Sequence, residues 1–250
     1  ELKVDIHQAL ALDYEKFTQF LKAKKEAEQI LKIEKRNIWA LQYLLFLSEK
    51  EENWDQAVGL TKQIQKITGK HDPDDLARFQ VYKGLEKLKS GFPDEARSFF
   101  NKALKSSPDF GLPYRYLGDV FEQIRDLVKA VESWESFAVR DIKNASLVFG
   151  KIESALFDLG RYSEVENFYR RILEIDSSNF EAIIRLANVL EEKGEDGAAL
   201  SLIEDAIDPQ SIDVRGEIMK LKLSLTTSTP VELSHQIDSI LEKLSDAKDS

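Results

Sequence analysis

The sequence contains no cysteine among its 250 residues. This absence excludes disulfides, thiolate zinc sites and cysteine nucleophiles, and it leaves the redox compartment of the protein open. Proline and glycine are also scarce, at six and eleven residues. The long intervals between these residues favour helices.

Long apolar runs and an excess of basic residues are missing too. The longest apolar run, IWALQYLLFL at 38–47, is shorter than the roughly 18 residues of a membrane-spanning helix, so it predicts a buried helix and no direct membrane insertion. The formal net charge is −10. Nucleic-acid-binding proteins present a basic face to phosphates. We therefore expect protein or peptide partners and no nucleic acid.

What the sequence does contain is a repeat. Six anchor residues recur at intervals of 34, 39, 34, 35 and 34 residues: Ala23, Ala57, Ala96, Ala130, Val165 and Ala199. A glycine stands five residues before three of them, at Gly91, Gly160 and Gly194. Glycine permits the positive φ of a tight turn between two helices. Each unit therefore predicts two antiparallel helices.

Small residues also stand twelve positions before several anchors, at Ala11, Gly84, Gly118 and Ala187. We expect them to let the two helices of a pair approach closely, with the residue four after the anchor, such as Trp134, filling the space beside them. Close packing would offset the cost of about 1 kcal/mol for a glycine inside a helix. The fifth unit departs from this pattern with Glu153 and Val165.

The stretches YRYLGDVF, AVESW and GFPDEARSFFNKALKSSP resemble the tetratricopeptide (TPR) repeat, whose period is about 34 residues. The resemblance implies an all-α, TPR-like right-handed superhelical solenoid of about six helix pairs with a C-terminal capping helix pair. The expected domains are a repeat array at 1–207 and capping helices at 208–250. The expected repeat units are near 4–37, 38–71, 77–110, 111–145, 146–179 and 180–207.

Two segments lie outside this regular pattern. The extra residues before the third anchor fall at TGKHDPDD, 68–75, which predicts a solvated loop that caps the next helix. A metal site at His71 and a hinge between two sub-arrays are the alternatives. Near the C-terminus we expect helices at 211–225 and 231–245, the second with an apolar stripe that covers the last core layer: Leu233, Ile237, Ile240, Leu241 and Leu244.

Similarity to TPR proteins implies a concave, protein-binding groove lined by the first helix of each pair. The predicted groove residues are Trp39, Tyr43, Phe46, Arg78, Tyr82, Leu85, Arg115, Tyr116, Lys151 and Arg185. Three tyrosines, fourteen residues before consecutive anchors, would form a ladder that buries apolar side chains of a partner. The four cations would orient acidic groups. In the alternative interpretation, the aromatic residues only seal one helix pair against the next.

The charge at one groove position reverses along the chain. Seven residues before the successive anchors the series is Lys16, Lys50, Lys89, Gln123, Asp158 and Glu192. A carboxylate clamp of the kind found in chaperone-binding TPR proteins is only partly matched, by Arg185 and Asn188. No catalytic, cofactor-binding or metal motif is present, because the three histidines lie in distant segments and no glycine-rich phosphate loop or G-x-S-x-G turn occurs.

Beyond the generic repeat, the layout is similar to the lipopolysaccharide assembly protein B (LapB) family. The matching segments are LALDYEKF at 10–17, ALQYLLFLSEKEENWDQAV at 40–58 and DVRGEIMKLKL at 213–223. The resemblance implies a bacterial cytoplasmic scaffold, tethered to the inner membrane, that brings the deacetylase of lipid A synthesis to a membrane protease. The family's membrane anchor and paired CxxC motifs are not in this sequence.

The sequence begins with Glu1 instead of methionine, so we expect a processed or trimmed chain. It is then either a piece of a LapB-like protein or a TPR protein of another family. We expect a non-catalytic scaffold or adaptor without a cofactor. The alternatives are a self-associating structural module, which makes a homo-oligomer, and a chaperone or secretion adaptor.

Overall fold

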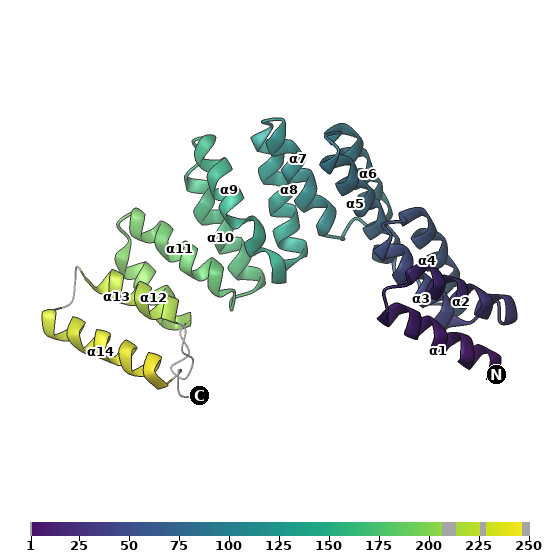
Figure 1. Cartoon of the computed structure of the whole chain (residues 1–250). Helices are drawn as coiled ribbons and strands as arrows, with labels where there is room; N and C mark the ends of the chain where they lie inside the picture. Colours follow the sequence, from purple (N-terminus) through teal and green to yellow (C-terminus); the bar gives the residue numbers. More distant parts are fainter. Residues whose placement is uncertain (1, 207–213, 226–228, 247–250) are drawn as a thin grey trace. The chain divides into compact units, whose positions relative to one another are not determined.

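The computed structural model describes residues 2–206, 214–225 and 229–246 (Figure 1). In these ranges the chain forms fourteen α-helices and one short 3-10 helix, and no strand. In chain order they are α1 (Leu2–Lys16), α2 (Phe20–Ile33), α3 (Ile38–Lys50), α4 (Trp54–Thr68), α5 (Pro73–Lys89), α6 (Pro93–Ser106), α7 (Leu112–Gln123), α8 (Leu127–Arg140), η1 (Ile142–Asn144), α9 (Ser146–Asp158), α10 (Ser163–Ile175), α11 (Phe180–Glu192), α12 (Asp196–Ala206), α13 (Val214–Ser224) and α14 (Pro230–Asp246).

The helices follow one another as sequential pairs, which confirms the predicted all-α, TPR-like class. Two compact units divide the chain, the first at Glu1–Val120 and the second at Phe121–Ser250, with the division inside α7. The predicted domain boundary at 207/208 lies outside the described residues, and the predicted repeat limits stay predictions. The two helices expected near the C-terminus are α13 and α14, and the side chain of Leu244 lies outside the described residues.

Polar side chains begin several of the helices. Asn37 accepts a hydrogen bond from the backbone N of Ala40 at 3.0 Å, at the start of α3. The loop before α5 is shorter than predicted, because Pro73 already begins the helix. Asp72 caps that helix as expected, by accepting a hydrogen bond from the backbone N of Asp74 at 2.9 Å. These caps satisfy backbone donors that have no partner within the helix.

A residue with positive φ stands five positions before all six anchors, although only three of these residues are glycines. The three glycines have φ values of 70° to 81°, as predicted for Gly91, Gly160 and Gly194. Thr18, Glu52 and Arg125 take the same left-handed conformation, with φ values of 57°, 52° and 62°. Such a conformation costs a non-glycine residue about 1–2 kcal/mol. The turn geometry of the repeat is therefore kept where its usual residue is missing.

The anchors are buried, with exposed fractions of 2% or less. In the third pair, Gly84 of α5 faces the ring of Phe100 on α6, and a Cβ added to Gly84 would lie 2.8 Å from Cδ1 of that ring. No side chain larger than hydrogen fits there without a shift of the helix or the ring. This contact joins the position twelve before the anchor to the position four after it, as the sequence predicts.

The same two positions meet differently in the fifth pair, where the sequence departs from the pattern. Glu153 replaces the small residue, and its carboxylate accepts a hydrogen bond from the Tyr169 hydroxyl at 2.5 Å. Arg185 of α11 donates to the other oxygen of Glu153 at 2.6 Å. Tyr169 is fully buried, and burial, together with its bond to Glu153, raises the pKa of its hydroxyl. A polar contact thus takes the place of the close helix approach.

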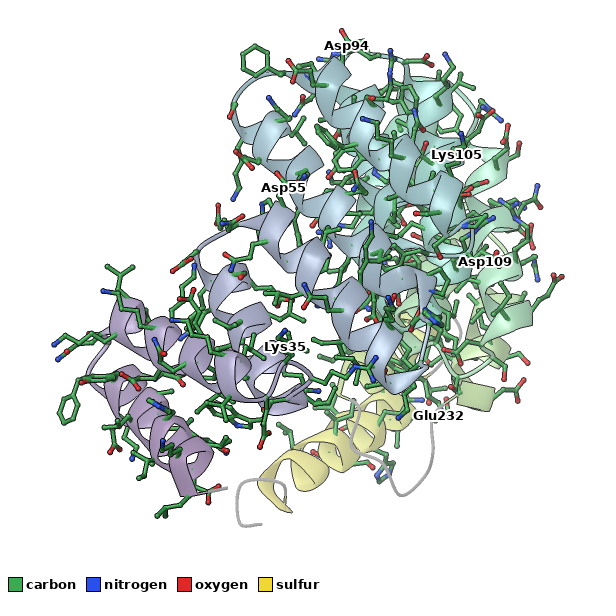
Figure 2. All side chains as sticks on the ribbon, turned by 90° about the vertical axis from the view of Figure 1, so that its right-hand side faces the viewer. Lys35, Asp55, Asp94, Lys105, Asp109 and Glu232 are labelled. Carbon is green, nitrogen blue, oxygen red and sulfur yellow. The ribbon has the colours of Figure 1, made fainter. Side chains whose placement is uncertain are left out.

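Charged side chains cover the outside of the helices. Figure 2 shows Asp55, Asp94 and Lys105 on the surface of the first unit, and all three are exposed. Some of the ion pairs join neighbours on one helix, such as Arg97 and Asp94 at 3.1 Å. Exposed pairs of this kind contribute about 0–1 kcal/mol each. The stability of the array therefore rests mainly on the buried contacts between helices.

We expect Gly84→Ala to lower the free energy of unfolding by about 1–2 kcal/mol. The overpacking cost of about 1–3 kcal/mol exceeds the gain of about 1 kcal/mol in helix propensity. Gly59 is the matched control, since it lies exposed within α4 with open space around an added Cβ. Gly59→Ala should raise stability by about 0.5–1 kcal/mol. Urea unfolding followed by circular dichroism measures both, and effects of the same sign would contradict the close-approach argument.

We also expect Glu153→Ala to cost about 1–3 kcal/mol, because it leaves the buried Tyr169 hydroxyl without an acceptor. Tyr169→Phe in the same background removes the stranded donor and should restore at least half of the loss. Urea unfolding of the two single variants and the double variant completes the cycle. Strictly additive effects would show that the hydrogen bond between these residues adds nothing to stability.

Candidate functional site

The first tyrosine of the predicted ladder belongs to the core. Tyr43 is 8% exposed, and its hydroxyl donates a hydrogen bond to the backbone O of Ala11 at 3.1 Å. Its ring stacks on Trp39 with centroids 5.0 Å apart. Burial raises the pKa of the Tyr43 hydroxyl, and the nearby Glu15 carboxylate raises it further. Tyr43 therefore seals α3 against α1.

The other two tyrosines are half-buried, and each rests on a ring of the preceding helix pair. The ring centroid of Tyr82 lies 4.8 Å from that of Trp54 on α4. The ring centroid of Tyr116 lies 5.8 Å from that of Phe100 on α6. Among the described residues, no ring contact joins one of the three tyrosines to another. They line successive seams between helix pairs and do not stack as one ladder.

Three of the four predicted groove cations are paired within the chain. Arg78 donates to Glu49 at 2.6 Å, and Lys151 lies 3.4 Å from Glu122. Arg185 bonds Glu153 at 2.6 Å and Glu181 at 2.8 Å.

The fourth cation, Arg115, lies over the ring of its neighbour Tyr116, at 5.4 Å from the centroid. The structure thus brings the predicted cations to the seams, where they already have carboxylates or rings to contact.

The remaining predicted residues lie at the seams of the first unit. Trp39 and Leu85 are half-buried, whereas Phe46 is 39% exposed. Lys50 covers two rings at once, with its ammonium 4.6 Å from the centroid of Phe46 and 4.7 Å from that of Phe20. We call the surface between pairs α1–α2 and α3–α4 the first seam. Its exposed aromatic surface is shielded by a lysine of the chain itself.

The second seam, between pairs α3–α4 and α5–α6, holds a cavity of about 370 Å³. Its lining includes Trp54, Tyr82 and Leu85, with Lys89 and Glu86 beside them. Trp54 Nε1 is buried and has no hydrogen-bond acceptor among the described residues. Cavities with apolar walls and a few polar groups are typical ligand sites. Two of the predicted groove residues, Tyr82 and Leu85, therefore line the same cavity.

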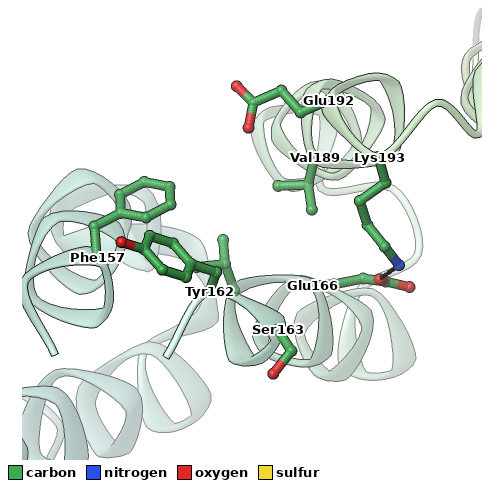
Figure 3. A pocket seen from close by; sticks show the side chains of 8 residues that line it. Phe157, Tyr162, Ser163, Glu166, Val189, Glu192 and Lys193 are labelled. Carbon is green, nitrogen blue, oxygen red and sulfur yellow. Dashed lines mark hydrogen bonds and ion pairs between the residues drawn. The ribbon is translucent and has the colours of Figure 1, made fainter. Parts of the chain in front are cut away.

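The fifth seam, between pairs α9–α10 and α11–α12, holds a cavity of about 320 Å³ (Figure 3). Phe157 and Tyr162 form one wall, with ring centroids 5.3 Å apart. Val189 and Glu192 line it from α11. Lys193 also faces the cavity and bonds Glu166 at 2.7 Å, drawn as a dashed line in Figure 3. That bond, with a second one from Arg170, lowers the pKa of Glu166.

Sequence reasoning missed the rings that open the second helices of three pairs. Phe20, Trp54 and Tyr162 each stand three residues before an anchor. The predicted groove residues all lie on the first helices of their pairs, whereas these rings stand at the start of second helices. An aromatic residue recurring at this fixed distance was the signal that could have found them.

The described residues contain no group of three or more His, Asp or Glu side chains that could hold a metal ion. His7 bonds Glu26 at 2.6 Å, across the first helix pair, and His71 and His235 are exposed. Within the same described part, no helix is both long and apolar enough to cross a membrane.

Comparison with known proteins finds no matching protein-family model. The curated relatives include lipopolysaccharide assembly protein B of Escherichia coli strain K12, which is 23% identical over 192 residues. The same protein of Escherichia coli O157:H7 matches to the same extent. The match covers 77% of this chain and 49% of the relative. The chain thus spans about half the length of the curated relatives that it matches.

Solved structures with similar folds include MamA, with a TM-score of 0.47, 21% identity and coverage of 67% of this chain and 97% of that one. YrrB, described as a TPR protein with an unusual peptide-binding site, has a TM-score of 0.45, 16% identity and coverage of 74% and 92%. PilF of Pseudomonas aeruginosa has a TM-score of 0.46, 13% identity and coverage of 85% and 90%. With its regular anchors and sequential helix pairs, the chain has an all-α, TPR-like fold, and its sequence is distantly similar to lipopolysaccharide assembly protein B.

Proposed function

We propose that this protein is a non-catalytic scaffold that binds other proteins through the seams of its helix pairs. The observation that carries the proposal is the pocket of the second seam, a cavity of about 370 Å³ that Trp54, Tyr82 and Leu85 line together with four polar or charged residues. A repeat array of this kind supplies extended surfaces for partners and needs no reactive group. Function then depends on which side chains line each seam.

The second-seam pocket suits an apolar side chain of a partner. Tyrosine and tryptophan rings contribute large contact areas at low cost in conformational entropy, and they dominate the energetics of many interfaces. Lys89 and Glu86 at the edge can bond polar groups that flank such a side chain. The half-buried Tyr82 is held in place by Trp54, so the surface is ordered before a partner arrives. Preorganisation of this kind reduces the entropic cost of binding.

The distant similarity to lipopolysaccharide assembly protein B supports a more specific role. In this role the chain lies on the cytoplasmic side of a bacterial inner membrane, held there by a segment outside this sequence. It brings the deacetylase of lipid A synthesis to a membrane protease and so limits lipopolysaccharide production. No residue of the chain takes part in catalysis, because the role requires only simultaneous contact with two proteins.

The pocket is tested with Leu85→Glu, which places a charge on its apolar wall. We expect binding of the purified deacetylase, measured by biolayer interferometry, to weaken at least about tenfold, the equivalent of about 1.4 kcal/mol. Lys89→Glu, on the exposed rim, should weaken binding as well and carries little risk to folding.

Lys105→Glu on the outer surface of α6 is the matched control and should bind like the unchanged protein (Figure 2). Circular dichroism verifies that all three variants stay folded. Equal binding by Leu85→Glu, Lys89→Glu and the control would reject the pocket. Absence of any binding to the deacetylase or the protease by the unchanged protein would reject the role resembling lipopolysaccharide assembly protein B.

A second candidate function, self-association, is favoured by the exposed face of α1. Ile6 stands seventeen residues before its anchor and is 50% exposed. The residues at this position in the other five pairs are buried: Ala40, Phe79, Pro113, Val148 and Ala182. The first pair therefore leaves exposed a position that is buried in each of the later pairs. Leu2 and Leu10 extend this exposed surface, at 73% and 38% exposure.

If a second copy of the chain covers this face, Ile6→Lys should shift the protein toward monomer at a given concentration. Burying a charged side chain in an apolar interface costs several kcal/mol. Multi-angle light scattering over a range of concentrations measures the change. Val128→Lys, at a 43% exposed apolar position on α8, is the matched control. A protein that is monomeric throughout excludes self-association as the function.

A further inference from the structure

The fifth-seam pocket has an exposed aromatic wall that no cation covers. Phe157 and Tyr162 are 44% and 61% exposed, and no Lys or Arg of the described residues lies over either ring. Elsewhere in the described chain, cations lie over many rings, for example Lys129 over Phe121 at 5.6 Å and Lys22 over Tyr14 at 5.4 Å. The pair in the fifth seam is thus left open on the surface.

The corresponding place in the first seam shows one way in which this chain covers such a ring. There Phe20 stands three residues before its anchor, and Lys50 stands seven residues before the next anchor. The Lys50 ammonium lies 4.7 Å from the centroid of Phe20. The cation and the ring attract each other because the face of an aromatic ring carries partial negative charge. The chain itself supplies the cation at this seam.

In the fifth seam the same two positions hold Tyr162 and Glu192. The ring is kept, but a carboxylate replaces the lysine. Glu192 is exposed and has no hydrogen-bond or ion-pair partner among the described residues. Figure 3 shows it on α11 next to Val189, across the pocket from the rings of Phe157 and Tyr162. The site therefore combines an uncovered aromatic wall with an unpaired negative charge.

The positive charges near this pocket are already neutralised. Lys193 bonds both Glu166 at 2.7 Å and Glu195 at 3.0 Å. Arg161, in the turn before α10, bonds Glu164 at 2.5 Å. Asp158, which follows Phe157, is exposed and, like Glu192, pairs with no described residue. The electrostatic environment of the rings thus favours a cation from outside.

We propose that the fifth-seam pocket binds an arginine side chain of a partner protein. The guanidinium stacks on the rings of Tyr162 and Phe157 and donates hydrogen bonds to the Glu192 carboxylate, while an apolar neighbour in the partner contacts Val189. Arginine fits better than lysine because its planar guanidinium stacks on aromatic faces and bonds a carboxylate through two N–H groups. This proposal specifies which side chain of a partner binds in the pocket. It rests on the proposed function only because it takes the ligand to be a protein segment.

The test uses two blocked heptapeptides, Ac-Gly-Ser-Leu-Arg-Leu-Ser-Gly-NH₂ and its twin with citrulline in place of arginine. Citrulline keeps the shape of arginine but lacks the charge, so the pair isolates the cation. The protein carries 3-fluorotyrosine at its seven tyrosines, and Tyr162→Phe identifies the ¹⁹F signal of Tyr162. Titration of each peptide follows that signal.

We expect the arginine peptide to shift the Tyr162 signal with a dissociation constant of about 1 mM or tighter. The citrulline peptide should bind at least about fivefold more weakly, since cation–π contacts contribute about 0.5–2 kcal/mol. Glu192→Lys should weaken binding of the arginine peptide by at least about tenfold, because it replaces the carboxylate with a repelling charge.

Glu174→Lys is the matched control. It makes the same change of charge at an exposed position near the C-terminal end of α10, away from Tyr162, which directly precedes the helix. It should leave the affinity unchanged. Equal binding of the two peptides, equal effects of Glu192→Lys and Glu174→Lys, or no shift of the Tyr162 signal would overturn the proposal. Any of these results leaves the second-seam pocket untouched, because Leu85→Glu tests that pocket separately.

Discussion

The close approach of two helices at one small residue is the constraint on which the rest of this structure depends. Where Gly84 faces Phe100, no larger side chain fits between the helices, so the crossing point of the pair is set by sterics and not by charge. Small residues stand at this position in four of the six pairs, at Ala11, Gly84, Gly118 and Ala187. The nearly constant interval of the repeat brings equivalent residues to equivalent seams. The seams, and the pockets in them, are consequences of that repetition.

The period of the anchors was sufficient to predict the helices, their pairing and the burial of the anchors, because packing at the anchors tolerates little change in side-chain volume. It could not predict how the chain keeps the repeat where the residues change. Thr18, Glu52 and Arg125 take a conformation that favours glycine, since the packed helices on both sides determine the turn. Glu153 replaces a small residue through hydrogen bonds to Tyr169 and Arg185, partners distant in sequence.

The candidate site was less predictable because exposure depends on what the neighbouring pair places against each side chain. Tyr43 and Tyr82 share one position in the repeat, yet the first bonds the backbone of Ala11 in the core and the second lines a pocket. The predicted cations lie at the seams, but glutamates of the chain pair with Arg78, Lys151 and Arg185. The position of a residue in the repeat predicts at which seam it lies, but it does not predict which side chains of the same chain it contacts there.

Charge variation at one repeat position gives chemically different seams on the same backbone. At the position seven residues before the anchor, Lys50 covers aromatic rings of its own chain, whereas Glu192 lines a pocket with rings that remain exposed. In the first seam a lysine of the chain already contacts the rings, which leaves little surface for a partner. In the fifth seam a ring and a carboxylate are both left available for contact with a partner. Because a change at an exposed position costs little stability, selectivity can differ from seam to seam while the close helix crossings keep the fold. If the seams bind partners as proposed, binding specificity is determined by exposed residues that the packing of the repeat does not constrain.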